Sequence, residues 1–239
     1  MNTNKELNLL NQKIVYDFTR FTTTDYVGEI SCIIWHISCN LRCSYCYNDN
    51  IVFAKQGLYT HNDILEFLNK RKSLLTAVVL SGGEATIHNL VYFCERIKKL
   101  GFKIKLDTNG INFKAIKELI SKNLLDFIAI DFKAPKDKFK LVTKKDDYEK
   151  MLKTIKYLLK IDFPFELRTT VNRDILDEND INKIINTIYC LGYKNIYYIQ
   201  NFLQTKSNIG NIRQNMVLNR NLIDDSKLTI NYRNQISLR

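Results

Sequence analysis

Three cysteines within eight residues are the part of this chain best suited to chemistry. Cys39, Cys43 and Cys46 follow the spacing CxxxCxxC, which places three thiols on one short loop, and the next cysteine, Cys94, lies far downstream. Thiolate ligands select iron–sulfur centres or zinc over hard cations. Three protein ligands leave one coordination position open, as in a working metal site rather than a closed structural one.

His36 offers an alternative use of the same cysteines. His36-x2-Cys39-x3-Cys43-x2-Cys46 would form a closed, structural Cys₃His zinc site. If His36 instead continues the apolar strand that contains Trp35, its side chain need not face the loop. The sequence leaves both arrangements open, and we favour the open three-cysteine site.

Other polar and glycine-rich segments directly follow short apolar runs that we predict to be strands. In a parallel β/α sheet all such points share the carboxyl edge, where these folds carry their sites. Several separate segments of the chain therefore predict a functional site at the carboxyl edge of the sheet. The segments are Ser81-Gly82-Gly83-Glu84, Asp107-Thr108-Asn109-Gly110, Asp131-Phe132-Lys133, Arg168 and Gln200.

Each of these residues also has a purely structural interpretation. Gly82 and Gly83 are a common strand–helix turn, although a chain without Cβ atoms also lets a ligand approach closely. Asp107 and Asp131 are equally suited to helix capping, and Lys133 to solvation. Arg168 is harder to dismiss, because a guanidinium within an apolar strand needs an anionic partner. We expect the remaining cysteines and histidines to be structural, with Cys32, Cys94 and Cys190 as small core residues and His61 and His88 as surface or capping residues.

The elements that must position these residues alternate between strand and helix. Six mostly unbroken apolar runs predict parallel strands covered by helices: Ile30–Trp35, Ala77–Leu80, Phe102–Leu106, Phe127–Ile130, Phe165–Thr170 and Asn195–Ile199. Between them, apolar residues three and four apart predict helices around Ile64–Leu68 (capped by Asn62 or Asp63), Val91–Ile97, Ile116–Ile120, Met151–Leu159 and Ile181–Ile188. This alternation predicts an α/β fold with right-handed crossovers, and periodicity alone leaves an open sheet and a partial barrel as alternatives.

Composition narrows the class of protein. The chain has 239 residues, no low-complexity spacer and a net charge of +11. The basic residues are spread along the whole chain and no RNA- or DNA-binding motif accompanies them, so nucleic acid is not the expected partner. Met1 to Arg20 is polar and no apolar run is long enough to span a membrane, so we expect a cytoplasmic protein with reduced cysteines.

These motifs resemble the radical S-adenosylmethionine (SAM) superfamily, whose members join CxxxCx(aromatic)C after the first strand to GGE after the second. Within it, the chain is similar to activating enzymes of glycyl-radical enzymes, in particular those of anaerobic ribonucleoside-triphosphate reductases. The segments that carry this resemblance are Asp25-Tyr26-Val27-Gly28, CNLRCSYCYN, SGGEAT, LDTNG, Asp131-x-Lys133-Ala-Pro and Arg168-Thr169-Thr170. The resemblance implies a parallel (β/α)₆ partial barrel over residues 26–200. Residues 1–25 would then form an N-terminal extension and residues 201–239 a tail that could cover one end of the barrel.

The resemblance also implies cofactors and residue roles. Cys39, Cys43 and Cys46 would each bind an iron of a [4Fe–4S] cluster, whose fourth iron takes SAM. Tyr45 would pack beside the cluster and adenine. One electron from the reduced cluster would cleave the sulfonium, giving a 5′-deoxyadenosyl radical that abstracts a hydrogen atom. The remaining implied roles are contact with the methionine amino end (Gly82, Gly83 and Glu84), contact with the ribose, the amino group or a monovalent cation (Asp107, Thr108 and Asp131), contact with the methionine carboxylate (Lys133), and contact with cofactor or substrate (Arg168).

The implied partners are a glycyl-radical enzyme, most simply an anaerobic ribonucleotide reductase, and an electron donor of the flavodoxin or ferredoxin type. Two departures weaken the substrate assignment: Tyr47 stands where many activating enzymes have histidine, and the second motif ends Glu84-Ala85 rather than Glu-Pro. Two other functions stay open. One is a radical SAM enzyme acting on a small molecule, in the manner of 7-carboxy-7-deazaguanine synthase, and the other is a zinc-stapled basic RNA-binding protein.

Overall fold

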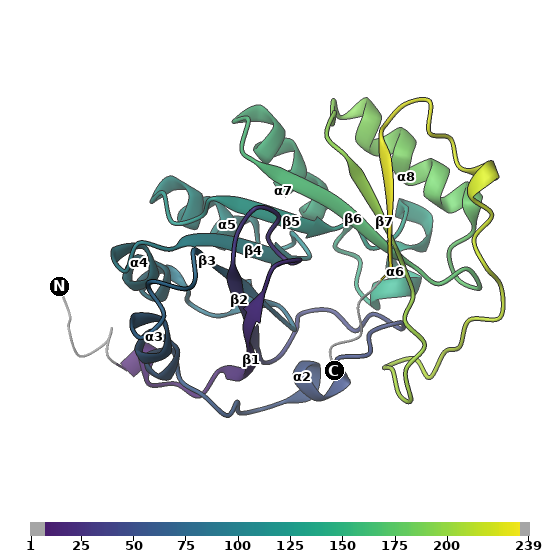
Figure 1. The fold of residues 1–239 in the computed structure, drawn as a ribbon. Helices are drawn as coiled ribbons and strands as arrows, with labels where there is room; N and C mark the ends of the chain where they lie inside the picture. The colour runs from purple at the N-terminus through teal and green to yellow at the C-terminus, as the bar shows by residue number, and fades with distance from the viewer. Residues whose placement is uncertain (1–7, 235–239) are drawn as a thin grey trace. The chain divides into compact units, whose positions relative to one another are not determined.

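The computed structural model describes residues 8–234, in which strands and helices alternate (Figure 1). The chain divides into two compact units. The amino-terminal unit comprises the residues up to Asn40 together with Asn50–Thr108 and Asn112–Ile128, and the carboxyl-terminal unit comprises Leu41–Asp49, Asn109–Ile111 and the residues from Ala129 onward. No helix within residues 8–234 has the length and apolar character needed to cross a membrane.

The amino-terminal unit is built on three parallel strands and one antiparallel edge strand. β2 (Ser31–His36), β3 (Ala77–Gly82) and β4 (Lys103–Thr108) run parallel, and β1 (Val15–Thr22) pairs antiparallel with β2. Buried apolar residues fill the middle of β2 and β3, as expected for strands covered on both faces. The helices are α2 (Asp49–Phe53), α3 (His61–Asn69), α4 (Val91–Lys99) and α5 (Phe113–Ser121), with a 3₁₀ turn η1 (Ala85–Ile87).

The carboxyl-terminal unit is also built on parallel strands. β6 (Phe165–Val171), β7 (Tyr197–Asn201) and β8 (Ile230–Asn234) are parallel, with Leu167 opposite Tyr197 and Tyr197 opposite Ile230. β5 (Phe127–Asp131) begins at the boundary between the units and ends in this one. The helices are α6 (Lys136–Thr143), α7 (Tyr148–Lys160) and α8 (Glu178–Cys190), and a 3₁₀ turn η2 (Arg220–Leu222) precedes β8.

The sequence predicted the central strands and most helices but missed two strands, β1 and β8, and two helices, α2 and α6. All six predicted strands are present as β2 to β7, and the five predicted helices as α3, α4, α5, α7 and α8. β1 and β8 were not predicted, because β1 is only partly buried and has no continuous apolar run. The predicted cap of α3 was wrong: Thr60 is the N-cap, and it forms a capping box with Asp63. The first seven and last five residues, which belong to the predicted extension and tail, lie outside the described range.

Candidate cofactor site

The cysteine loop leaves β2 and passes from one unit to the other. Cys39 belongs to the amino-terminal unit, whereas Cys43 and Cys46 belong to the carboxyl-terminal unit. In that second unit the loop backbone is tied to the end of α6, because the Arg42 and Ser44 amides donate to the carbonyls of Thr143 and Val142, both at 3.0 Å. This part of the loop is therefore held by hydrogen bonds of its backbone rather than of its cysteine side chains.

The thiols form a soft donor set in a sheltered environment. Cys43 is buried, Cys39 and Cys46 are partly buried, and none of the three is in a disulfide. Burial raises the pKa of the Cys43 thiol to about 11 and also raises the pKa of Cys46. Within residues 8–234 no three His, Cys, Asp or Glu side chains converge to hold a single metal ion. Thiolates are the donors that a [4Fe–4S] cluster takes, one for each iron, so the residue types fit a cluster.

The zinc alternative fails at His36, which continues β2 and is fully buried. Its Nδ1 donates to the Ser81 carbonyl (3.1 Å), since a carbonyl can only accept, and its Nε2 accepts from Nε2 of His61 (3.0 Å). Both ring nitrogens are thus used within the amino-terminal unit. The expectation that His61 lies at the surface was also wrong, because this ring is 1% exposed and stacks on Phe93 with centroids 3.8 Å apart.

The two glycines of the GGE segment bring it against the start of the cysteine loop. A Cβ on Gly82 would collide with the His36 backbone, and one on Gly83 would collide with the Ser38 carbonyl and lie 3.3 Å from Cβ of Cys39. Gly82 also has a φ of +123°, which side chains rarely adopt. The Gly83 and Glu84 amides donate to the carbonyls of His36 and Ser38, both at 2.9 Å. Close packing of two backbones therefore requires both glycines.

Glu84 is buried and bonded to neighbouring hydroxyls. Its Oε1 accepts from Oγ1 of Thr86 (2.5 Å) and from Oγ1 of Thr108 (2.7 Å). Thr108 ends β4, so this network joins the loops after two adjacent strands. The structure brings these two predicted residues together and fixes the Glu84 carboxylate at the carboxyl edge of β3 and β4.

Asp107 lies on the opposite face of β4 from Thr108, because successive side chains of a strand alternate. Its Oδ1 is 3.4 Å from Nζ of Lys105, which shares that face. Lys105 is buried and also donates to the carbonyl of Asp25 (2.5 Å). Neither Asp107 nor Asp131 caps a helix, so that structural interpretation of both residues was wrong.

In the carboxyl-terminal unit, Asp131 joins the two predicted cations. Its Oδ1 accepts from Nε of Arg168, and its Oδ2 accepts from Nζ of Lys133 at 2.9 Å. Burial raises the pKa of the Asp131 carboxyl, but the Arg168 and Lys133 charges outweigh it and hold that pKa below its usual value. Arg168 thus has the anionic partner that its place in a strand required, and Lys133 is not simply solvated.

Tyr45 connects this charged group to the cysteine loop. Nζ of Lys133 lies 5.9 Å from the centre of the Tyr45 ring, within the range of a cation–π contact. The Tyr45 ring is buried, and its hydroxyl has no hydrogen-bond partner in the described part of the chain. A buried hydroxyl normally has a partner, so the side chain that the sequence placed beside the cofactor is suited to contact a bound group.

Sequence reasoning missed two contributions to this region. The amides of Ile209 and Gly210, in the tail, donate to the carbonyls of Cys46 (2.9 Å) and Ser44 (2.8 Å), and nothing in the sequence marks these residues. Lys105 was missed because a lysine inside an apolar run is easily assigned to the surface. Cys190 was predicted to be a core residue but is exposed.

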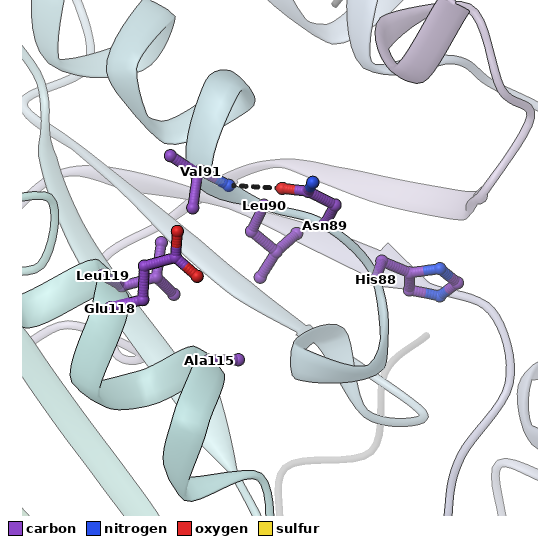
Figure 2. Close-up of a pocket in the computed structure, with 7 residues that line it drawn as sticks. All are labelled: His88, Asn89, Leu90, Val91, Ala115, Glu118 and Leu119. Carbon is purple, nitrogen blue, oxygen red and sulfur yellow. Dashed lines mark hydrogen bonds between the residues drawn. The ribbon is translucent and has the colours of Figure 1, made fainter. Parts of the chain in front are cut away.

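A pocket between the start of α4 and α5 is separate from this chemistry (Figure 2). It is lined by His88, Asn89, Leu90, Val91, Ala115, Glu118 and Leu119, none of which belongs to the predicted cofactor set. Asn89 uses its Oδ1 to accept from the Val91 amide at 3.3 Å. The pocket therefore adds no residue to the candidate site.

Known proteins resemble this chain in sequence and in fold. The family described as the Radical SAM superfamily matches residues 33–188. A protein of Methanocaldococcus jannaschii, provisionally named a glycyl-radical enzyme activating enzyme, is 34% identical over 200 residues, which cover 79% of this chain and 80% of that protein. A provisionally named GTP 3′,8-cyclase of Saccharolobus solfataricus is 28% identical over 172 residues, covering 68% of this chain and 54% of the cyclase.

Among solved structures, Streptococcus suis SuiB bound to S-adenosylmethionine matches with a TM-score of 0.67 at 14% identity. The match covers 82% of this chain and 48% of SuiB. This likeness confirms the fold class expected from the sequence, an α/β partial barrel built on a mostly parallel sheet.

Proposed function

The chain belongs to the radical SAM superfamily, and we propose that it is an activating enzyme that installs a glycyl radical on a partner protein, an anaerobic ribonucleotide reductase. Members of this superfamily use a [4Fe–4S] cluster and S-adenosylmethionine. Together these cofactors supply one-electron cleavage of a sulfonium bond and abstraction of a hydrogen atom. The protein contributes placement of the reactants and exclusion of water.

One observation carries the choice of an activating enzyme: the extent of the match to the M. jannaschii protein. That similarity covers about four-fifths of both chains, so the two proteins are of comparable size and correspond through most of their length. The chain spans only about half of the cyclase relative, so that comparison does not extend to the whole cyclase. The substrate class of the first relative is therefore the better guide to the substrate of this chain.

Cys39, Cys43 and Cys46 are the proposed cluster ligands, and the proposed SAM-binding residues are taken unit by unit. In the amino-terminal unit, the Gly82-Gly83-Glu84 segment is fixed against the residues that precede Cys39. It would present its backbone to the methionine amino end. Asp107 lies at the carboxyl end of β4, where it would orient a cationic group or the ribose.

In the carboxyl-terminal unit, the charged group is suited to an anion. Asp131 carries one negative charge and Arg168 and Lys133 carry two positive charges, which leaves a net charge of +1. Asp131 uses one oxygen for each cation, so its role is to orient them. Lys133 and Arg168 would then bind a carboxylate, on the methionine end of SAM or on the substrate, as charge-assisted donors.

A second candidate is a radical SAM enzyme that acts on a small molecule. The similarity to a GTP 3′,8-cyclase gives this alternative a relative of named activity. A nucleoside triphosphate is also an anion and would suit the same positive charge. The two candidates therefore differ in the substrate and share the cofactor chemistry.

The test is a direct comparison of the two substrates. The protein is reconstituted anaerobically with iron, sulfide and SAM, reduced by flavodoxin or dithionite, and mixed with an anaerobic ribonucleotide reductase or with GTP. We expect 5′-deoxyadenosine in amounts that rise with the reductase, together with a glycyl-radical signal in the electron paramagnetic resonance spectrum of the reductase. A Cys43→Ala variant should give neither. Product formation that depends on GTP, with no protein radical, would overturn the proposal in favour of the second candidate.

A further inference from the structure

The connection between β7 and β8 is unusual for two parallel strands. Such strands need a crossover that returns the chain to the other end of the sheet, and a helix normally provides it. Here residues 202–229 contain only the short turn η2 and otherwise follow an irregular path, the green-to-yellow segment of Figure 1. Loops of this length without secondary structure are uncommon in compact domains and usually functional. We call residues 202–216 the strap.

The strap is anchored firmly at both ends within the carboxyl-terminal unit. At its start, the Phe202 amide donates to the Val171 carbonyl at 3.0 Å, and the Phe202 ring is buried. At its end, the Asp174 carboxylate accepts from the amides of Asn215 (2.8 Å) and Met216 (3.1 Å). Both anchors lie on β6 or the loop that follows it. The strap is therefore fixed independently of the cysteine loop.

A self-contained turn occupies the middle of the strap. The Asn208 side chain accepts from the Ile212 amide (2.8 Å) and donates to the Ile212 carbonyl (2.7 Å), so one residue closes the turn with both ends of its amide group. The Asn211 amide also donates to the Asn208 carbonyl. Asn211 has a φ of +48°, a conformation that asparagine tolerates better than most residues. This turn directs the amides of Ile209 and Gly210 outward.

Those two amides bind the cysteine loop at its third predicted ligand and at the residue that follows the second. The Ile209 amide donates to the Cys46 carbonyl and the Gly210 amide to the Ser44 carbonyl. Because the Ser44 amide is already bound to α6, the Ser44 peptide is held from two sides. A Cβ on Gly210 would lie 2.7 Å from the Ser44 carbonyl oxygen and 2.8 Å from the Ser44 Cβ, so only glycine allows this approach.

We propose that the strap is part of the cofactor site, in which Gly210 and Asn208 are positioning residues that hold the cysteine loop in its cluster-binding conformation. Neither residue touches the cluster ligands with its side chain. Gly210 permits the close approach, and Asn208 shapes the turn that makes it. The inference depends on the cysteines as ligands and is independent of which substrate the enzyme takes.

The experiment measures how quickly the cluster is lost. Reconstituted Gly210→Ala and Asn208→Ala proteins are challenged with an iron chelator anaerobically, and loss of the visible absorbance of the cluster is followed beside the unfolding midpoint in urea. We expect cluster loss to accelerate about tenfold, the effect of weakening two neutral hydrogen bonds that oppose local opening. Gly101→Ala is the matched glycine control, because Gly101 has a φ of +93° but no neighbour near its Cβ. Asn62→Ala is the asparagine control, because Asn62 lies in the first turn of α3 and its side chain donates to Oδ1 of Asn11 (2.5 Å).

Hydrogen exchange in the protein without cluster gives a second readout. Gly210→Ala should speed exchange of the amides in residues 41–46, whereas Gly101→Ala should leave them unchanged. If Gly210→Ala loses its cluster no faster than an equally destabilised Gly101→Ala, or if exchange in residues 41–46 is unchanged, the proposal is wrong. A Cys43→Ala variant that retains a full cluster would instead contradict the ligand assignment, so the two failures are distinguishable.

Discussion

Each unit contains a cluster of titratable side chains whose state can be compared: the cluster in the amino-terminal unit is neutral, and the cluster in the carboxyl-terminal unit is charged. In the amino-terminal unit, the histidine cluster consists of His36, His61 and His88. Burial lowers the pKa of His36 to about 3 and that of His61 well below its usual value, so both rings are neutral near neutral pH. Their nitrogens hydrogen bond to each other and to the Ser81 carbonyl.

In the carboxyl-terminal unit, the charged cluster of Asp131, Lys133 and Arg168 stays ionised. Burial lowers the pKa of Lys133, but the Asp131 charge outweighs it and holds the Lys133 pKa well above its usual value. The difference lies in the partners, because the histidines are bound by neutral groups and Lys133 by a carboxylate. A neutral cluster can only fix the backbone around it, whereas a cluster with net charge can also attract a ligand.

Removing Asp131, the anion of the charged cluster, should cause the largest loss in the free energy of unfolding. Asp131→Ala would leave two partly buried cations next to each other without a partner. Because the Asp131 side chain is 26% exposed, we expect the free energy of unfolding to fall by up to about 3 kcal/mol, the lower end of the loss that follows when a buried ion pair is broken from one side. Asp137→Ala is the matched control, since Asp137 pairs with Lys183 at the surface, and should cost about 0–1 kcal/mol. Urea unfolding near neutral pH measures both, and equal losses would remove the distinction between buried and exposed pairs.

Acid should affect the histidine cluster first. The folded pKa values of His36 and His61 lie below the unfolded value of 6.5, so the unfolded state binds more protons as the pH falls below 6.5. Stability is then complete above pH 6.5 and declines below it, by up to about 1.4 kcal/mol per pH unit for each histidine. Asp131 does not contribute until the pH approaches its unfolded value of 3.8, because its folded pKa is lower still.

Glutamates with a lowered pKa, such as Glu29 and Glu178, begin to contribute near their unfolded value of 4.5. Urea unfolding between about pH 5.5 and pH 6.5 therefore reports on the histidines. His61→Gln keeps a donor for Nε2 of His36 but cannot take up a proton in this range. We expect the free energy of unfolding of the variant to depend less steeply on pH, with a slope reduced by up to about 1.4 kcal/mol per pH unit, the contribution of one proton. An unchanged slope would mean that His61 does not titrate differently in the folded and unfolded states, contrary to its burial.

The same two clusters show how far the sequence could predict the site. Arg168 was expected to need an anion because of its place in an apolar run, and Asp131 supplies it. That inference worked because a buried charge has few alternatives. The pairing of His36 with His61 was not predicted, because a neutral imidazole can be satisfied in many ways and the two residues are far apart in sequence. The contact between Gly210 and Ser44 was also missed. Its hydrogen bond joins backbone atoms that every residue has, and the two residues are far apart in sequence.

The strands also differ in how well the sequence predicts them. Strands buried on both faces, such as β2 and β3, have continuous apolar runs that identify them without any knowledge of their neighbours. After the buried Val15, β1 has a mixture of partly buried and exposed positions without a regular alternation. β8 also lacks a continuous apolar run, so both strands depend on pairing with their neighbours β2 and β7. The local sequence pattern therefore predicts strands that are buried on both faces. It does not predict strands that form only because they pair with a neighbouring strand.

We expect the smallest effect from removing the positive charge of Lys133. This change tests whether that charge binds a ligand or only holds Asp131. Lys133→Met keeps most of the side-chain volume and leaves Asp131 paired with Arg168, so the fold should persist. If Lys133 contacts the SAM carboxylate, its loss should weaken SAM binding about tenfold, in line with one charge-assisted hydrogen bond. Equilibrium dialysis of reconstituted protein with labelled SAM measures this, beside Lys136→Met, whose partner Glu149 lies on the exposed surface. Equal affinity in the two variants would show that the positive charge serves only to hold Asp131, and the charged cluster would then be as purely structural as the histidines.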